Sequence, residues 1–267
     1  MTGMIAAAHT IFRKRGMILS FAWRDIQQRY QGSFLGLLWS ILNPMVMLGV
    51  YTFVFGMIFK AKWGGVNDTY LFAIGLYASL LAFNIFAEVL SRSPGIILSN
   101  ASYVTKIIFP IEVFPVVLIL SALFNYVIGL AVWVVAYLVF FGLPHVTILL
   151  IPVVLLPLVL MLLGMAWIVS AIGVYVRDIA QLVGVFVSCA MFITPIFYPV
   201  SIIPEDYRGV MQVNPLALII DNLSVVMIRG GQINWVDYSS QLAFSLLICA
   251  AGLSLFVKLK KGFGDVL

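Results

Sequence analysis

Long apolar runs separated by short polar breaks dominate the chain. Each run has about 20 or more residues, the length that a helix needs to cross a hydrocarbon core of about 30 Å. The runs predict six membrane-spanning helices, at residues 34–59, 70–90, 107–141, 146–176, 179–198 and 238–257. Because the runs are continuous and do not alternate, they exclude a closed β-barrel. We therefore predict an all-α polytopic membrane protein with one transmembrane domain over residues 1–267.

The N-terminal segment, residues 1–33, carries a polar cluster directly before the first run. Residues 24–39 read RDIQQRYQGSFLGLLW. Apolar side chains recur at helical spacing on one face of this segment: Leu19, Ala22, Trp23, Ile26 and Tyr30. Arg24, Asp25 and the glutamines occupy the other face. This pattern predicts an amphipathic interfacial helix, with Gly32 providing the bend into the first span.

A second short helix is predicted inside the nominal loop between the fifth and sixth spans, residues 199–237. The stretch NPLALIIDNLSVVMIRGG places Asn214 at an N-cap, Pro215 in the first turn, and Gly230 with Gly231 at the end. Its length of about 15 residues is too short to span a membrane. We predict a re-entrant or interfacial helix on the outer side.

Composition and charge agree with a membrane protein and set its orientation. The chain is 63% hydrophobic and 9% charged, whereas soluble domains average about 25% charged residues. The net charge of +5 comes from residues at the ends of apolar runs, so membrane topology explains it better than nucleic-acid binding. The outer side would hold Lys60, Lys62, Arg208 and Arg229, and the remaining 11 of the 15 basic residues would lie inside. This bias predicts that both termini are cytoplasmic.

Signs of catalysis or metal binding are absent from the sequence. It contains no phosphate-binding GxxxxGK[ST] motif, and its two histidines, His9 and His145, are far apart. The two cysteines lie in apolar runs and are interpreted as packing residues. Glu88 and Arg92 have the spacing of a helix-end ion pair. Glu112 sits between two prolines and is either a gate residue or a structural carboxylate at the interface.

Aromatic side chains form stripes on two of the predicted spans. Tyr51, Phe55 and Phe59 recur every four residues on the first span, and Phe186, Ile193 and Phe197 share a face of the fifth. Such stripes are usually helix-packing surfaces. The alternative is a smooth aromatic path on which sugar rings of a long polymer stack.

The polar cluster and three later stretches resemble the permease subunits of bacterial polysaccharide ABC exporters. In this family an Arg-Asp pair precedes Arg-Tyr, then Ser-x-Leu-Gly-x-x-Trp and a proline. These positions are filled by Arg24, Asp25, Arg29, Tyr30, Ser33, Leu35, Gly36, Trp39 and Pro44. IEVFPVV with NYVIG, VRDI, and TPIFYP with NPL follow in the family's order. The resemblance is to the type-2 exporters of the Wzm, KpsM and teichoic-acid group, and most to the O-antigen Wzm type.

The resemblance implies a non-catalytic transport subunit in the bacterial inner membrane. It implies a homodimer in which each permease binds one Wzt-like ABC ATPase. ATP and Mg²⁺ would be held by the ATPase, and no cofactor by this chain. The cargo would be an undecaprenyl-diphosphate-linked polysaccharide such as O-antigen. Capsular polysaccharide, teichoic acid and a small molecule are alternative cargoes. The alternative from another class is a membrane-bound glycosyl or prenyl transferase, which would need a clustered acidic metal site that this sequence does not contain.

The resemblance also assigns candidate roles to residues. The channel candidates are Trp39, Tyr51, Phe55, Phe59, Phe186 and Phe197. The candidates for the lipid diphosphate or a gate are Arg24, Arg29 and Glu112. The ATPase-coupling candidates are Arg92, Ser99, Asn100, Tyr103, Lys106, Arg177 and Asp178, and the periplasmic gate candidates are Asn214, Pro215, Asp221 and Arg229. For the two N-terminal arginines the alternatives are anchoring at the inner leaflet and pairing with Asp25 or the ATPase.

Overall fold

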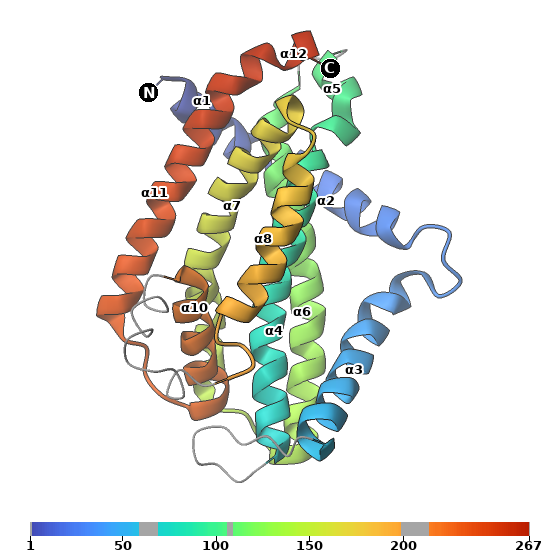
Figure 1. The fold of residues 1–267 in the computed structure, drawn as a ribbon, viewed down its shortest axis with the longest axis vertical. Helices are drawn as coiled ribbons and strands as arrows, with labels where there is room; N and C mark the ends of the chain where they lie inside the picture. The colour runs from blue at the N-terminus through green and yellow to red at the C-terminus, as the bar shows by residue number, and fades with distance from the viewer. Residues whose placement is uncertain (1, 59–68, 106–108, 199–213, 267) are drawn as a thin grey trace.

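The chain folds into an up-and-down bundle of helices (Figure 1). The computed structural model describes residues 2–58, 69–105, 109–198 and 214–266, and none of these forms a strand. Both termini lie at the same end of the bundle, the upper end in Figure 1. Termini on one side are what an even number of membrane crossings requires.

Five helical segments are long and apolar enough to span a membrane: Gly36–Ile58, Tyr70–Gly95, Ile111–Phe141, Val146–Tyr175 and Trp235–Val266. The long α-helices within them are α3 (Trp39–Tyr51), α4 (Thr69–Arg92), α6 (Phe114–Phe141), α7 (Ile151–Tyr175) and α11 (Trp235–Leu259). The first segment ends in a π-helix, η2 (Thr52–Ile58), and the third and fourth begin with the 3-10 turns η5 (Ile111–Val113) and η6 (Val146–Leu150). The predicted end of the first span, Phe59, lies outside the described residues.

Shorter elements lie around these helices. They are α1 (Thr2–Arg13), α2 (Arg15–Tyr30), η1 (Gly36–Leu38), η3 (Ser93–Gly95), η4 (Leu98–Asn100), α5 (Ala101–Thr105), α8 (Ile179–Ile193), α10 (Pro215–Ser224), the π-helix η8 (Val225–Arg229), η9 (Lys260–Gly262) and α12 (Phe263–Val266). Helices α1, α5 and α12 lie with the termini at the upper end (Figure 1).

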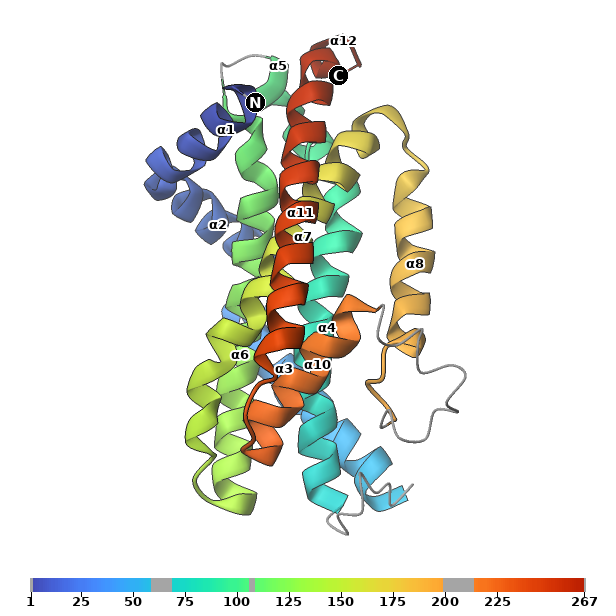
Figure 2. The same cartoon turned by 90° about the vertical axis from the view of Figure 1, so that its left-hand side faces the viewer.

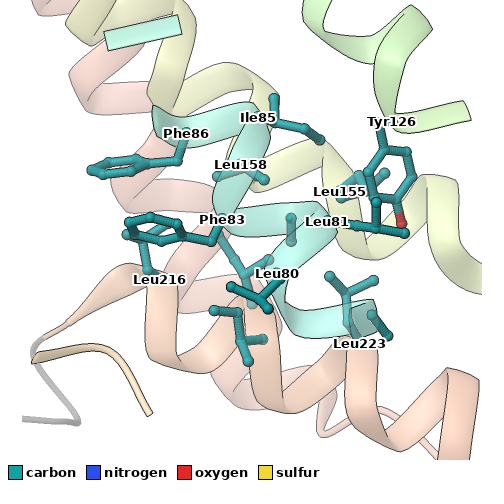
Figure 3. Close-up of a cluster of buried hydrophobic side chains, with 14 of the residues drawn as sticks. Leu80, Leu81, Phe83, Ile85, Phe86, Tyr126, Leu155, Leu158, Leu216 and Leu223 are labelled. Atoms are coloured by element: carbon teal, nitrogen blue, oxygen red, sulfur yellow. The ribbon is translucent and has the colours of Figure 1, made fainter. Parts of the chain in front are cut away.

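Helix α4 is the centre of the bundle. Its most apolar stretch is 78% buried inside the chain, and it packs against α3, α6, α7, α8 and α10. Figure 3 shows Phe83 of α4 pointing toward Leu216 of α10, with Leu158 of α7 nearby. A helix surrounded on all sides has no polar face, which explains why its sequence reads as a continuous apolar run.

The predicted fifth span is shorter in the structure than in the sequence pattern. Helix α8 has 15 residues, or about 22 Å at 1.5 Å per residue, less than the thickness of a hydrocarbon core. It ends at Ile193 because Thr194 is extended (ψ 134°), as residues before a proline usually are. Figure 2 shows α8 at the edge of the bundle.

The short helix predicted after the fifth span is present with its predicted caps. The Asn214 side chain accepts a hydrogen bond from the Leu216 amide at 3.0 Å, and Pro215 opens α10. Gly230 ends the π-helix η8 in the left-handed conformation, with φ 63°. Ile219 and Leu223 are fully buried, and α10 packs against α4 and α7. The re-entrant position of this helix in a membrane stays a prediction.

The amphipathic N-terminal helix is present as α2, but its buried stripe differs from the predicted one. Ile18, Ala22 and Ile26 face the bundle, whereas Leu19 and Trp23 are exposed. The spacing of four residues aligns the three buried side chains in one row along α6. Of the predicted apolar face, Ala22 and Ile26 are buried, while Ile18 replaces Leu19 because α6 sets the direction of the buried face.

Helices α7 and α11 cross at two glycines, which allows their backbones to touch. A Cβ atom on Gly164 would collide with the Ile248 carbonyl, and one on Gly252 with the Gly164 carbonyl. Small residues at such crossings allow the close van der Waals packing that joins helices in lipid.

We expect Gly164→Ala to destabilise the subunit by about 1–3 kcal/mol, because the two backbones must separate to admit a methyl group. The melting temperature of the purified protein in a fixed detergent would measure the change. Gly49→Ala is the matched control, because a Cβ atom there has nothing within 4 Å. Equal melting temperatures for the two variants would contradict the assignment of this crossing as a packing contact.

Candidate functional site

Four charged side chains join α2 to α4. We call Asp25, Arg29, Glu88 and Arg92 the charge quartet. The Arg92 guanidinium donates to both Asp25 carboxylate oxygens, at 2.6 and 3.1 Å. Arg29 pairs with Asp25 at 3.3 Å and also with Glu88, while Arg92 lies 3.5 Å from Glu88. The predicted Glu88–Arg92 pair is thus confirmed within a larger network.

The electrostatics of the quartet favour an ionised Asp25. Burial alone would raise the pKa of this carboxyl group. The hydrogen bonds and positive charge of Arg92, with a hydrogen bond from Ser121 and the charge of Arg29, outweigh burial and lower its pKa below the ordinary 3.8. Asp25 therefore stays charged at physiological pH and holds α2 in place.

Hydrogen bonds extend the quartet to α6. The Asn125 side chain donates to Glu88 Oε2 at 3.0 Å, and the Tyr30 hydroxyl donates to Asn125 Oδ1 at 3.5 Å. Three helices are thus tied together at one level of the bundle. Sequence reasoning missed the role of Asn125, although an amide within an apolar run was a usable signal, because such groups are costly in lipid without a partner.

Arg24 points toward a different partner from Arg29. Its guanidinium donates to the Tyr103 hydroxyl at 3.2 Å and lies 4.6 Å above the Phe21 ring. The side chain is otherwise exposed. The contact links α2 to α5, so the structure brings two of the predicted site residues together.

The other coupling candidates lie apart from this contact. Ser99 and Asn100 bond the Ile96 carbonyl within their own turn, at 3.2 and 2.9 Å. Arg177 and Asp178 are exposed in the connection between α7 and α8, and neither forms an ion pair with any described residue. Lys106 lies outside the described residues.

Glu112 is buried and paired. Its side chain is 6% exposed and lies 3.0 Å from the Lys260 ammonium group. The Trp167 indole donates to the Glu112 carbonyl oxygen at 3.0 Å. These contacts fasten the C-terminal end of the chain to the start of α6. They agree with the structural interpretation of Glu112, and its gate role stays a prediction.

The aromatic stripes of the first and fifth runs meet within one subunit. Phe55 stacks on Phe197 with the ring centroids 6.0 Å apart. Tyr51 and Phe55 pack against the main core, and Phe186 is half exposed but contacts Phe86. Trp39 opens α3 and is 39% exposed. The described rings are thus packing residues in a single chain, and their channel role stays a prediction.

Two helices of the bundle leave most of their surface uncovered. Only 6% of the first spanning segment is buried, and Val183 is the one buried residue of α8. The exposed surface of α8 carries Gln181 and Ser188 among apolar residues. The uncovered face of α8 thus combines apolar side chains, which can pack against protein, with polar side chains, which can contact water.

The outer gate candidates join the short helix to its neighbours. The Asn214 amide donates to Thr194 Oγ1 at 3.1 Å, which ties α10 to the end of α8. Asp221 and Arg229 form an ion pair of 3.0 Å, with both side chains half exposed. The gate role of these residues and of Pro215 stays a prediction.

The fold and the candidate site define a multi-pass helical membrane protein. The chain belongs to the ABC-2 type transporter family, whose profile matches residues 17–228. It is 26% identical over 264 residues to an O-antigen export system permease protein, RfbA, of Myxococcus xanthus, covering 98% of this chain and 99% of the relative. It is 27% identical over 246 residues to RfbA of Klebsiella pneumoniae, covering 91% and 92%.

A relative from a second transport system is also similar. The polysialic acid transport protein KpsM of Escherichia coli is 24% identical over 240 residues, covering 87% of this chain and 89% of the relative. Membership in the family makes this chain a membrane component of a transporter and implies an ATPase partner.

We expect Arg92→Ala to loosen α2 from α4, because it leaves two carboxylates facing one arginine. Its side chain is 32% exposed, so we expect a modest cost of about 1–2 kcal/mol for the docking of α2. Faster hydrogen exchange over residues 15–30 would report it. Arg177→Ala removes an exposed arginine and serves as the control, and equal exchange in both variants would refute the role of the quartet.

The pKa of Asp25 sets the pH range over which α2 stays docked. A carboxyl group whose pKa is lowered by folding stabilises the fold above its unfolded pKa, and this contribution is lost as pH falls through the folded pKa. We therefore expect the distance between spin labels at Ser20 and Ser91 to stay constant from pH 8 to pH 5 and to change below about pH 4. A change between pH 7 and pH 5 would show that another group controls docking.

Proposed function

We propose that this chain is the membrane subunit of an ATP-driven exporter that moves an undecaprenyl-diphosphate-linked polysaccharide, such as O-antigen, across the bacterial inner membrane. One observation carries the proposal, namely the similarity to O-antigen export permeases over 91–98% of the chain. The match to the Myxococcus xanthus relative covers 98% of the chain, and with it nearly all of the amphipathic N-terminus, the spans and the outer helix.

The uncovered helices support a homodimer. The first spanning segment and α8 are the two apolar elements with the least buried surface, and a second copy of the chain would cover part of it. The polar side chains Gln181 and Ser188 on α8 would then face a hydrated path between the subunits. Such a path suits a polymer of sugars better than lipid does.

The positions of the charged residues support cytoplasmic termini and six crossings. Arg13 ends α1, and Lys260 precedes α12; both helices lie at the end of the bundle that holds both termini (Figure 1). Arg229 ends η8, which follows α10 in the other half of the bundle. In addition to the five long segments, one more crossing, the predicted fifth span, would be made by α8 together with residues 194–198. Helix α10 would then lie on the outer side as a gate.

The coupling of ATP hydrolysis to transport would pass through α2. The partner ATPase, two copies per permease dimer, would hold ATP and Mg²⁺ at the cytoplasmic face. A force on α5 would reach α2 through the Arg24–Tyr103 contact. The charge quartet would pass it to α4, because Asp25 and Arg92 are joined by two short hydrogen bonds.

Arg24 is better placed than Arg29 to bind the lipid diphosphate. The Arg29 Nη2 atom is shared by the Asp25 and Glu88 carboxylates of the quartet, and the Arg29 side chain is 21% exposed. Arg24 is exposed and has a neutral hydroxyl as its polar partner. Arginine binds phosphate well because its planar donors match phosphate oxygens.

Capsular polysaccharide is the second candidate cargo, supported by the similarity to KpsM. Teichoic acid and small molecules are weaker candidates because neither is named among the relatives described above. The polymer that disappears from the surface of a deletion strain would identify the cargo.

We expect deletion of the gene to remove one surface polysaccharide while its lipid-linked form accumulates inside the cell. Immunoblotting of surface glycan and analysis of the lipid-linked pool would measure both effects, with the plasmid-borne wild-type chain as the control. We expect the wild-type chain to co-purify with an ABC ATPase in a two-plus-two complex. Normal surface glycans in the deletion strain, together with a permease that binds no ATPase, would refute the proposal.

A further inference from the structure

A partly open cavity lies among α3, α4 and α6. Its volume is about 400 Å³, which falls in the range of ligand pockets. Three amides and four phenols are among the residues that line it: Asn43, Asn84, Asn125, Tyr30, Tyr51, Tyr77 and Tyr126. We call it the amide cavity. Its position within one subunit separates it from the uncovered faces of the first segment and α8.

One buried polar group that lines the cavity has no partner among the described residues. The Tyr126 side chain reaches from α6 toward Leu81 of α4 (Figure 3), and its buried hydroxyl has no hydrogen bond to any described residue. From Leu71 to Leu90, all of which the structure describes, Asn84 is the one exposed residue. Polar groups at this depth are costly unless something hydrogen-bonds them. The cavity is therefore built to hold a hydrogen-bonding molecule.

The charges around the cavity favour a neutral occupant. Among the described residues that line it, Glu88 is the one charged side chain. Its carboxylate is already engaged by Arg29, Arg92 and Asn125. A phosphate or a sugar acid would find no free cation there, and an amine would find no free carboxylate.

The remaining chemistry is that of a sugar site. Side-chain amides both donate and accept hydrogen bonds, as sugar hydroxyls do. Phenol rings provide flat apolar faces for the C–H side of a pyranose ring, and their hydroxyls add polar contacts. Tyr51, Tyr77 and Tyr126 supply such rings next to the amides.

A second cavity offers a route from the cytoplasmic side. It has a volume of about 520 Å³ and lies in the bend between α2 and α3, where Arg24, Gln27 and Gln28 line it. Tyr30 lines both cavities. A lipid-linked sugar held near the exposed Arg24 would therefore be separated from the amide cavity by the Tyr30 side chain.

We propose that the amide cavity binds one uncharged sugar ring. The assignment of that sugar to the exported glycan, near its lipid anchor, rests on the export function proposed above. Asn84 and the Tyr126 hydroxyl are the hydrogen-bonding groups that recognise it, and Tyr30 separates the site from the cavity that contains Arg24.

Saturation-transfer NMR tests the binding directly. The full-length permease would be placed in lipid nanodiscs prepared without sugar-based detergent. The probes are free galactose, mannose and N-acetylglucosamine, with glucuronic acid as the charged comparison. We expect a signal from at least one neutral sugar, none from glucuronic acid, and binding about fivefold weaker in Asn84→Leu and in Tyr126→Phe.

Tyr238→Phe is the matched control for Tyr126→Phe. Its hydroxyl donates to the Val153 carbonyl at 3.0 Å, and Tyr238 does not line the amide cavity. We expect this variant to bind sugar like the wild type. No signal from any neutral sugar, or equal signals from the wild type, Asn84→Leu and Tyr126→Phe, would overturn the proposal.

A competition experiment and an export assay connect the site to the glycan. We expect the polyprenyl-diphosphate-linked form of the bound sugar, added to the nanodisc, to displace the free sugar; no displacement would overturn the link to the exported glycan.

In deletion cells that produce equal amounts of each variant, we expect Asn84→Leu to slow the appearance of surface glycan. A wild-type chain that fails to restore surface glycan would refute the export function, while the NMR result still decides the sugar site.

Discussion

The enclosure of α4 by the other helices is the constraint on which the rest of the subunit depends. Within a bilayer the hydrophobic effect does not drive helices together, because lipid tails are as apolar as the side chains. Helices therefore associate through close packing and polar contacts. Helix α4 uses both. Its apolar run packs against five neighbouring helices, and its C-terminal end carries Glu88 and Arg92, which hold α2. The helix that forms the core therefore also positions the polar site.

The helical architecture could be read from the sequence because it depends on local properties. Run length indicates which segments can cross a membrane, and Asn214 with Gly230 marks the ends of the outer helix through cap chemistry. The length of α8 was overestimated because apolar residues continue past Ile193. The extended Thr194 and the following proline end the helix there. The prediction followed the apolar pattern to residue 198 and gave too little weight to this proline.

The candidate site was less predictable, because its partners are far apart in the chain. Asp25 and Arg92 are 67 residues apart, and Glu112 and Lys260 are 148 apart. No periodicity joins such pairs, so sequence reasoning identified the charged residues without their partners. For Arg29 it left two roles open, the lipid diphosphate and a pair with Asp25, and the structure shows the pair with Asp25. The amide cavity was missed for the same reason, since Asn43, Asn84 and Asn125 belong to three different runs.

The charge quartet has a consequence for a protein in an energised membrane. A transmembrane voltage acts on net charge, with about 2.3 kcal/mol per elementary charge for each 100 mV. Asp25, Arg29, Glu88 and Arg92 sum to zero and share one junction, so moving them together as a unit through the field requires almost no electrical work. The quartet therefore adds almost no electrical work to a shift of the junction between α2 and α4, in a resting or in a fully energised cell.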